Sequence, residues 1–153
     1  MAFAAKYLFL LVLLLALVFI DLDGFKVIND SHSHEVGDHI LQEVAHRIRT
    51  VVRPHDTVAR WGGDEFLVLL ERLDDATAGL QVVQRIMAAV AEPIRHLDQD
   101  FEVTASLGVA FCRASDKVAA DELVRRADSA MYRVKRAGPN AFAVYDSIGD
   151  LAL

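Results

Sequence analysis

Apolar and polar residues follow two different periods along this chain, and together they predict strands that alternate with helices. Apolar residues at every third or fourth position indicate a helix buried on one side, whereas continuous or alternating apolar runs indicate strands. Pro54 and Pro93 mark the ends of two helical stretches, because proline cannot continue a helix. The pattern predicts strands at about 15–21, 57–61, 66–70, 101–111 and 141–145, helices at about 25–31, 36–52 and 120–137, and another helix between a cap at Asp74 or Asp75 and Pro93. Helices packed on a mainly antiparallel sheet make an α+β domain.

The N-terminal region has the least ordinary pattern. Only Lys6 interrupts an apolar run from Ala2 to Ile20. About 20 apolar residues suffice to span a bilayer, and a signal peptide has a similar pattern. The end of this run is also the first strand, however, and the roughly 13 residues that remain before it are too few for a helical span. We therefore expect residues 1–14 to form a hydrophobic extension that packs on the domain, with membrane attachment as the alternative.

Length and composition narrow the classes of function. A chain of 153 residues fits one domain with a sizeable core, which we place at residues 15–146, followed by a tail at 147–153. The net charge of −6 argues against nucleic acid as a partner, because a general nucleic-acid binder normally shows a basic face. The single cysteine, Cys112, excludes an internal disulfide and fits a reducing compartment. It ends an apolar strand, so we expect a packed thiol rather than a nucleophile.

The stretch from Arg60 to Phe66 reads Arg-Trp-Gly-Gly-Asp-Glu-Phe and lies between two predicted strands. It therefore predicts a hairpin turn. Glycines let the backbone turn tightly and approach a ligand closely. Two carboxylates at such a turn, Asp64 and Glu65, can hold a hard cation that faces a polyphosphate. Gly-Gly-Asp is also ordinary turn chemistry, so this motif needs support from elsewhere in the chain.

A second motif supplies that support at the end of the first strand. Asp21 and Asp23 are two positions apart, so in a strand they begin on the same face. Acids at the end of an apolar strand are costly unless they are solvated, paired or bound to a metal. The backbone N–H groups around Gly24 and Phe25 open a helix and would suit phosphate oxygens. Together the two motifs predict a metal clamp for a nucleoside triphosphate.

These motifs resemble the GGDEF family of diguanylate cyclases, over about residues 15–145. The matching segments are Phe19–Lys26, Ile28–Asp30, His34–Asp38, Asp56–Arg60, the signature turn, Thr104–Ala110, Ala127–Tyr132 and Lys135–Gly138. The resemblance implies a ferredoxin-like core related to the palm of polymerases and nucleotide cyclases. It also implies a cytoplasmic enzyme that condenses two GTP into cyclic di-GMP and two pyrophosphates across a homodimer.

The resemblance further implies a role for each residue of the motifs. Asp21 and Asp64 resemble the side-chain ligands of two Mg²⁺ or Mn²⁺ ions, assisted by the carbonyl of Leu22. Asp64, Glu65 and Lys26 correspond to catalytic residues, and Glu65 is a further acid of the metal site. The positions that correspond to GTP-binding residues are Gly24, Phe25, Asn29, Asp38, Gly62, Gly63 and Lys135. Among these, Asn29 and Asp38 match positions that read the guanine base.

Several of these residues also have an ordinary structural explanation. Asp38 can cap a helix, Asn29 can lie on a helix surface, and Lys26 and Lys135 can simply be solvated. Asp23 can hydrogen-bond the loop that follows it. His32, His34 and His39 lie close in sequence but lack the spacing and partners of a zinc site.

Two departures from the family pattern bear on activity. The Asp-x-Leu-Thr-Gly-Leu-x-Asn-Arg motif that commonly precedes the first strand is absent from this sequence. The family commonly has Gly-Arg-Asn after the last helix, where this chain has Gly138, Pro139 and Asn140. Proline offers neither charge nor a donor, and losing one charge-assisted phosphate contact costs about 1.5–3 kcal/mol. We therefore expect weaker GTP binding rather than none.

Arg53 and Asp56 match the RxxD inhibitory site of the family, where the cyclic dinucleotide product binds and stops synthesis. Five residues separate Asp56 from Gly62, as in that motif. Arginine can stack on guanine and clamp phosphate, and aspartate can accept hydrogen bonds from the guanine edge. The alternative is a surface ion pair, because RxxD is common by chance.

Two other functions stay open at this point. The domain can be a binding module that holds GTP or cyclic di-GMP and signals without turnover, which the missing motif and Pro139 favour. It can also be an inert fragment of a larger membrane sensor with no stable fold alone.

Overall fold

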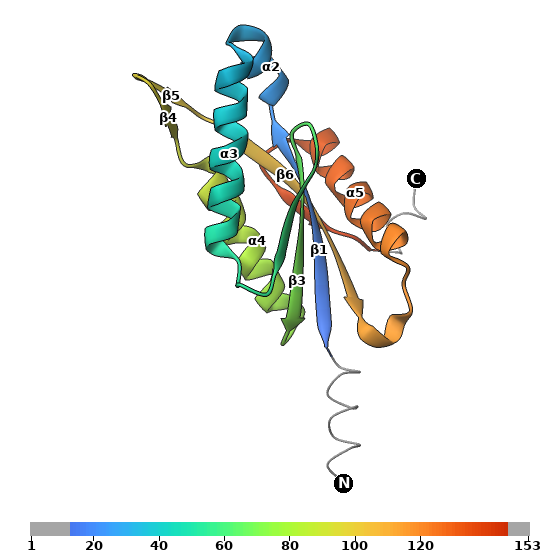
Figure 1. Cartoon of the computed structure of the whole chain (residues 1–153). Helices are drawn as coiled ribbons and strands as arrows, with labels where there is room; N and C mark the ends of the chain where they lie inside the picture. Colours follow the sequence, from blue (N-terminus) through green and yellow to red (C-terminus); the bar gives the residue numbers. More distant parts are fainter. Residues whose placement is uncertain (1–12, 147–153) are drawn as a thin grey trace.

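The computed structural model describes residues 13–146 (Figure 1). The expected tail at 147–153 and all but two residues of the expected extension at 1–14 lie outside the described residues. The elements in chain order are β1 (Leu14–Asp23), α2 (Phe25–Ser31), α3 (His34–Val51), β2 (Thr57–Gly62), β3 (Glu65–Leu73), α4 (Ala76–Ala91), β4 (Ile94–His96), β5 (Gln99–Phe101), β6 (Thr104–Arg113), the 3₁₀ turn η1 (Ala114–Asp116), α5 (Ala120–Ala137) and β7 (Phe142–Val144).

The strands β2-β3-β1-β6-β7 form one sheet with helices on both faces, which confirms the predicted α+β fold. β1 lies at the centre and runs antiparallel to β3 and β6, whereas the short β7 runs parallel to β6. Helices α3 and α4 cover one face and α5 covers the other (Figure 1). Within residues 13–146, no helix is both long and apolar enough to cross a membrane.

The alternation of side chains along β1 divides the core between the two faces. Val18 and Ile20 belong to the cluster that includes buried residues of α3 and α4. Leu17 and Phe19 belong to the cluster that includes buried residues of α5. Because successive residues point to opposite faces, Asp21 continues the face of Leu17 and Phe19 and lies on the α5 side.

Helix ends follow local capping chemistry. Asp75 caps α4, its carboxylate accepting from the N–H of Ala78 at 2.8 Å, as one of the two predicted caps. Helix α3 is capped by Ser33, whose hydroxyl accepts from the N–H of Val36. The alternative that Asp38 caps this helix is therefore wrong, because Asp38 lies within it.

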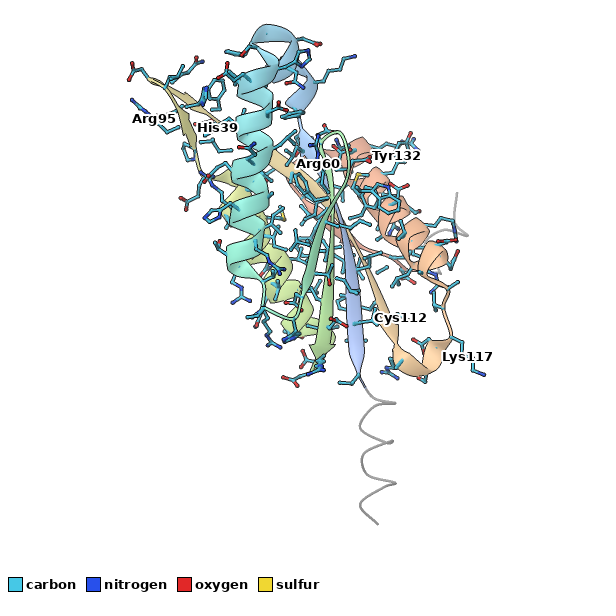
Figure 2. All side chains as sticks on the ribbon, in the orientation of Figure 1. His39, Arg60, Arg95, Cys112, Lys117 and Tyr132 are labelled. Atoms are coloured by element: carbon cyan, nitrogen blue, oxygen red, sulfur yellow. The ribbon has the colours of Figure 1, made fainter. Side chains whose placement is uncertain are left out.

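The stretch predicted as one strand at 101–111 is instead divided. β4 and β5 form a small hairpin that projects beyond α3 (Figure 1), and β6 begins only at Thr104. Strands of three residues are too short to show a period, so the hydrophobic pattern could not reveal them. Long-range contacts hold the hairpin instead: His39 Nε2 lies 3.2 Å from the carbonyl oxygen of Arg95, and His32 Nε2 lies 3.4 Å from Gln99 Nε2. Figure 2 shows His39 beside Arg95.

Candidate functional site

The two acidic motifs meet where β1 ends and β2 turns into β3. Asp21 pairs directly with Glu65 in the β1–β3 ladder, so their side chains share the α5 face. The N–H of Leu22 donates to the carbonyl oxygen of Asp64 at 3.1 Å, which ties the turn to the end of β1. Gly63 has φ of 27° and Gly24 has φ of 70°, a backbone region that glycine adopts most easily. The fold thus brings together acids that are far apart in sequence.

The acids at this junction repel one another. Burial raises the pKa of Asp21 above its ordinary value, and the nearby charges of Asp64 and Asp23 raise it further. Burial also raises the pKa of Glu65, with further contributions from the charges of Asp21 and Asp64. Like charges gathered on one face of a sheet are unfavourable unless a cation lies among them.

Lys135 of α5 supplies such a cation. Its Nζ donates to Oδ1 of Asp21 at 2.5 Å and lies 4.0 Å from Oδ1 of Asp23. This hydrogen bond and the lysine charge both lower the pKa of Asp21 and partly offset the effect of burial. The sequence predicted Lys135 to bind phosphate or be solvated, and the structure places it against these carboxylates.

Asp23 accepts hydrogen bonds from three groups of the protein. Its carboxylate accepts from the hydroxyls of Thr104 and Ser106, each at 2.7 Å, and from the N–H of Asn140 at 3.0 Å. From the sequence, one alternative was that Asp23 hydrogen-bonds the loop that follows it. That alternative is wrong, because the donors come from β6 and from the turn after α5. Asp23 therefore fixes the position of the segment that contains Pro139.

A divalent cation suits the chemistry of these groups. Carboxylate and carbonyl oxygens are the ligands that Mg²⁺ and Mn²⁺ prefer. The mutual repulsion of Asp21, Asp64 and Glu65 is of the kind that a cation relieves. Within residues 13–146, no three His, Cys, Asp or Glu side chains are already arranged around a metal position. A metal ion bound by Asp21 would have to replace the Lys135 contact.

A cavity of about 420 Å³ lies on the opposite face of the sheet, between α3 and the β2–β3 hairpin. Its lining residues are Asp38, Leu41, Gln42, Ala45, Val58, Arg60 and Phe66. It has apolar walls and an exposed carboxylate from Asp38 at its rim, a combination that suits a flat polar ring. Arg60 donates from Nε to the carbonyl oxygen of Gly63 at 2.9 Å and so links this cavity to the signature turn.

The two base-reading residues predicted from the sequence come from neighbouring helices. Asn29 lies on α2 and Asp38 lies on α3. Asn29 is half-buried, and its Oδ1 is buried without a hydrogen-bond partner. The alternative that Asn29 is merely a helix-surface residue does not describe this arrangement.

Comparison with known proteins identifies the family of the chain. The family model described as "Diguanylate cyclase, GGDEF domain" matches residues 13–141 of the chain. This chain belongs to the GGDEF family.

The GGDEF domain is similar to curated proteins of several bacteria. It is 39% identical over 132 residues to the bifunctional diguanylate cyclase/cyclic di-GMP phosphodiesterase MucR of Pseudomonas aeruginosa, covering 86% of this chain and 19% of MucR. It is 41% identical over 127 residues to diguanylate cyclase A of Treponema denticola, covering 82% of this chain and 34% of that protein. The chain thus spans only a fraction of the length of these relatives.

Solved structures confirm the fold. The GGDEF-only form of TpbB from Pseudomonas aeruginosa aligns with a TM-score of 0.84 at 34% identity, covering 99% of this chain and 86% of that one. The GGDEF domain of DgcB from Caulobacter crescentus, solved in complex with cyclic di-GMP, aligns with a TM-score of 0.79 at 29% identity, covering 88% and 80% of the two chains.

The predicted inhibitory pair of this GGDEF domain lies in the loop before β2. Asp56 is only 4% exposed, and its carboxylate accepts from the N–H of Arg53 at 2.8 Å and the N–H of Glu71 at 3.0 Å. Its backbone carbonyl accepts from Arg49 at 2.7 Å. Asp56 therefore fixes the loop, whereas the side chain of Arg53 is the exposed member of the pair.

The other predicted residues of the GGDEF domain differ in their exposure to solvent. Lys26 is exposed on α2, and the ring of Phe25 is buried in the core, so only its backbone faces the site. Cys112 is buried as expected and lies toward the end of the sheet away from Arg60 (Figure 2). A cavity of about 430 Å³ beside Cys112 contains none of the predicted site residues.

Sequence reasoning missed three polar residues of the site: Arg60, Thr104 and Ser106. Arg60 is the first residue of the signature stretch, but only the folded hairpin shows that it pins the turn. Thr104 and Ser106 stand two positions apart at the start of a largely apolar strand, a signal that they share a face with something polar. That signal did not identify Asp23 as the partner.

Proposed function

We propose that this GGDEF domain is a diguanylate cyclase that condenses two GTP into cyclic di-GMP and two pyrophosphates. The observation that carries the proposal is the junction at the end of β1, where Asp21, Glu65 and the signature turn meet beside Lys135. The phosphates of a nucleotide would lie at this junction, and its base would extend into the cavity lined by Asp38.

In this proposal the acids hold the metal and the other residues hold the nucleotide. Asp21 and Asp64, with the carbonyl of Leu22, would hold Mg²⁺ or Mn²⁺, with Glu65 as the adjacent acid. When bound, the metal supplies Lewis-acid chemistry that lowers the pKa of a hydroxyl and neutralises charge on phosphate. Gly62 and Gly63 would let the turn lie close to the nucleotide.

Cationic and backbone groups would hold the triphosphate. Lys135 is within reach of the carboxylates and would pass from Asp21 to a phosphate when the metal binds. Lys26 is exposed on the first turn of α2, beside the backbone N–H groups that follow Gly24. We propose that these groups orient the α-phosphate for attack.

Base recognition and dimerisation complete the proposal. Asp38 would accept from the N1–H and 2-amino groups of guanine, and Asn29 would pair with its acceptor edge. One domain holds one GTP, so two domains would face each other antiparallel, and each 3′-hydroxyl would attack the opposite α-phosphate. We therefore propose a homodimer as the active form, in the cytoplasm where GTP is found, with membrane attachment through residues 1–14 as the alternative.

Product inhibition is proposed at Arg53. Its exposed guanidinium can clamp phosphate and stack on guanine. The carboxylate of Asp56 is already bonded to two N–H groups, so we propose that it holds Arg53 in place rather than contacting the base. Arg53→Ala should then relieve inhibition by cyclic di-GMP and leave synthesis otherwise intact.

A binding module without turnover is the second candidate function. Pro139 removes one expected phosphate contact. In the described structure, the Asp21 carboxylate is hydrogen-bonded to Lys135. Such a module would bind GTP or cyclic di-GMP and release no pyrophosphate.

Incubation of the purified chain with GTP and Mg²⁺ separates the two functions. A cyclase forms cyclic di-GMP, Asp64→Ala abolishes product, and the surface variant Arg125→Ala retains it. GTP binding without product favours the module. A protein that binds neither GTP nor cyclic di-GMP would contradict both proposed functions. A cooperative thermal melt that GTP shifts upward would argue against an inert fragment.

A further inference from the structure

We propose that Gly37 is a positioning residue that orients the carboxamide of Asn29 and so sets the preference for guanine. The inference deepens the proposed function and rests on it, because it concerns how the same nucleotide would be read. The inference explains why a glycine lies inside helix α3, where glycine lowers stability relative to alanine.

The first observation is steric. A Cβ atom added to Gly37 would lie 1.9 Å from Oδ1 and 3.0 Å from Cγ of Asn29. Contacts this close do not occur, so any larger residue would force the carboxamide out of its position. Gly37 is a buried residue of α3 and has no unusual positive φ, so its backbone does not require glycine. The missing side chain therefore provides a slot for Asn29.

The second observation concerns hydrogen bonding. The buried Oδ1 of Asn29 has no hydrogen-bond partner in the part of the chain that the structure describes. Its Nδ2 is not among the buried unpaired atoms there, and no hydrogen bond of this nitrogen occurs in the described residues, so the amide donors are accessible to solvent. The slot thus holds the oxygen end of the carboxamide against Gly37 and presents the nitrogen end.

The consequence is a donor group on α2 and an acceptor group on the neighbouring helix α3. Gly37 is followed directly by Asp38, whose exposed carboxylate is an acceptor group in the lining of the cavity. Asn29 presents donors from α2, and its carboxamide oxygen lies against Gly37 of α3. A base that offers both an acceptor edge and N–H donors, as guanine does, satisfies both groups. Rotation of the Asn29 carboxamide would remove the donor half of this recognition.

A double-mutant cycle on nucleotide affinity tests the inference. The ligands are 3′-deoxy-GTP and 3′-deoxy-ATP with Mg²⁺, because without a 3′-hydroxyl neither can react. Affinities are measured by calorimetry for the wild type, Gly37→Ala, Asn29→Ala and the double variant. We expect each single variant to weaken 3′-deoxy-GTP binding about tenfold, the effect of one lost hydrogen bond. The double variant should bind like Asn29→Ala, and 3′-deoxy-ATP affinity should change little.

Additive losses, or unchanged affinity in Gly37→Ala, would overturn the inference. Wild-type protein that does not bind 3′-deoxy-GTP would instead contradict the proposed function. The matched control is Gly79→Ala in α4, where a Cβ meets the side chains of Phe111 and Leu73 rather than a site residue. If Gly37→Ala does not fold, the double variant should fold, because the Asn29→Ala change removes the clash. If both fail, Gly37 serves packing against Phe25, whose ring atom Cζ lies 3.3 Å from the added Cβ, and the inference is wrong.

Discussion

Lys135 Nζ lies 2.5 Å from Oδ1 of Asp21 and joins the last helix to the end of the central strand. The pair is partly exposed, at 33% for the lysine side chain and 14% for the aspartate. It places a positive charge among carboxylates that otherwise repel one another. The same carboxylate is the metal ligand of the proposed function, so lysine and metal would compete for it.

Removing Lys135 should therefore make the domain more dependent on metal. We expect Lys135→Ala to lower the free energy of unfolding in EDTA by about 1 kcal/mol, allowing for solvent screening of the pair. Added Mg²⁺ should raise the thermal midpoint more in the variant than in the wild type. Equal shifts in the two proteins would show that metal and lysine do not share Asp21.

Glu65→Gln should stabilise the metal-free domain at neutral pH. Burial and the charges of Asp21 and Asp64 raise the pKa of Glu65, so the folded protein disfavours its ionised form. The contribution of Glu65 to stability is then most favourable below the ordinary pKa of 4.5, and it is lost as pH rises through the raised pKa. Thermal melts in EDTA should show a higher midpoint for the variant at pH 7 and no difference near pH 4. A lower midpoint at pH 7 would contradict the repulsion.

The loop before β2 should depend on Asp56 and not on Arg53. Asp56→Ala leaves two backbone N–H groups without an acceptor, those of Arg53 and Glu71. We expect a loss of about 2–4 kcal/mol in urea unfolding. Arg53→Ala changes an exposed side chain and should stay within about 0.5 kcal/mol of the wild type. Similar losses in both variants would mean that the guanidinium also supports the loop.

Glu122 should contribute to stability only above acidic pH. Hydrogen bonds from Arg125 and Arg126 lower its pKa from 4.5 to about 2. A lowered carboxyl pKa contributes stability above 4.5, and the contribution is lost as pH falls toward about 2. Glu122→Gln should lower the thermal midpoint slightly at pH 7, less in high salt, and progressively less below pH 4.5. Glu102→Gln, on an exposed residue, is the control.

Gly108 should tolerate no side chain. A Cβ on this residue of β6 would lie 1.9 Å from the carbonyl oxygen of Ala127 and 2.3 Å from the backbone nitrogen of Met131. Both are backbone atoms of α5, so the helix would have to move away from the sheet. Gly108→Ala should cost about 3 kcal/mol or more in chemical unfolding. Gly79→Ala meets only side chains and should cost less.

The fold was predictable where the chain carries long, periodic segments. The bounds of α5 match its expected range, those of α3 differ from theirs by at most two residues, and the signature turn joins two strands as expected. The β4–β5 hairpin was missed, because its strands are short and their partners, His32 and His39, are distant in sequence. Local pattern carries no information about such contacts.

The candidate site was also predictable only in part. The motifs identified the acids and the glycines, because these residue types in that order are unusual. They did not indicate that Lys135 would lie on Asp21, that Asp56 would be buried, or that Thr104 and Ser106 would bind Asp23.

The sequence by itself determined the alternation of strands and helices, the family, and which residues carry charge near the turn. Only the tertiary structure decided which charges meet, which acids are held by protein donors, and what a side chain at position 37 would meet. The physical reason is the distance along the chain over which each kind of interaction acts. Periodicity and turn chemistry act over a few residues, whereas burial and charge pairing depend on packing that joins β1, β6 and α5 across most of the chain.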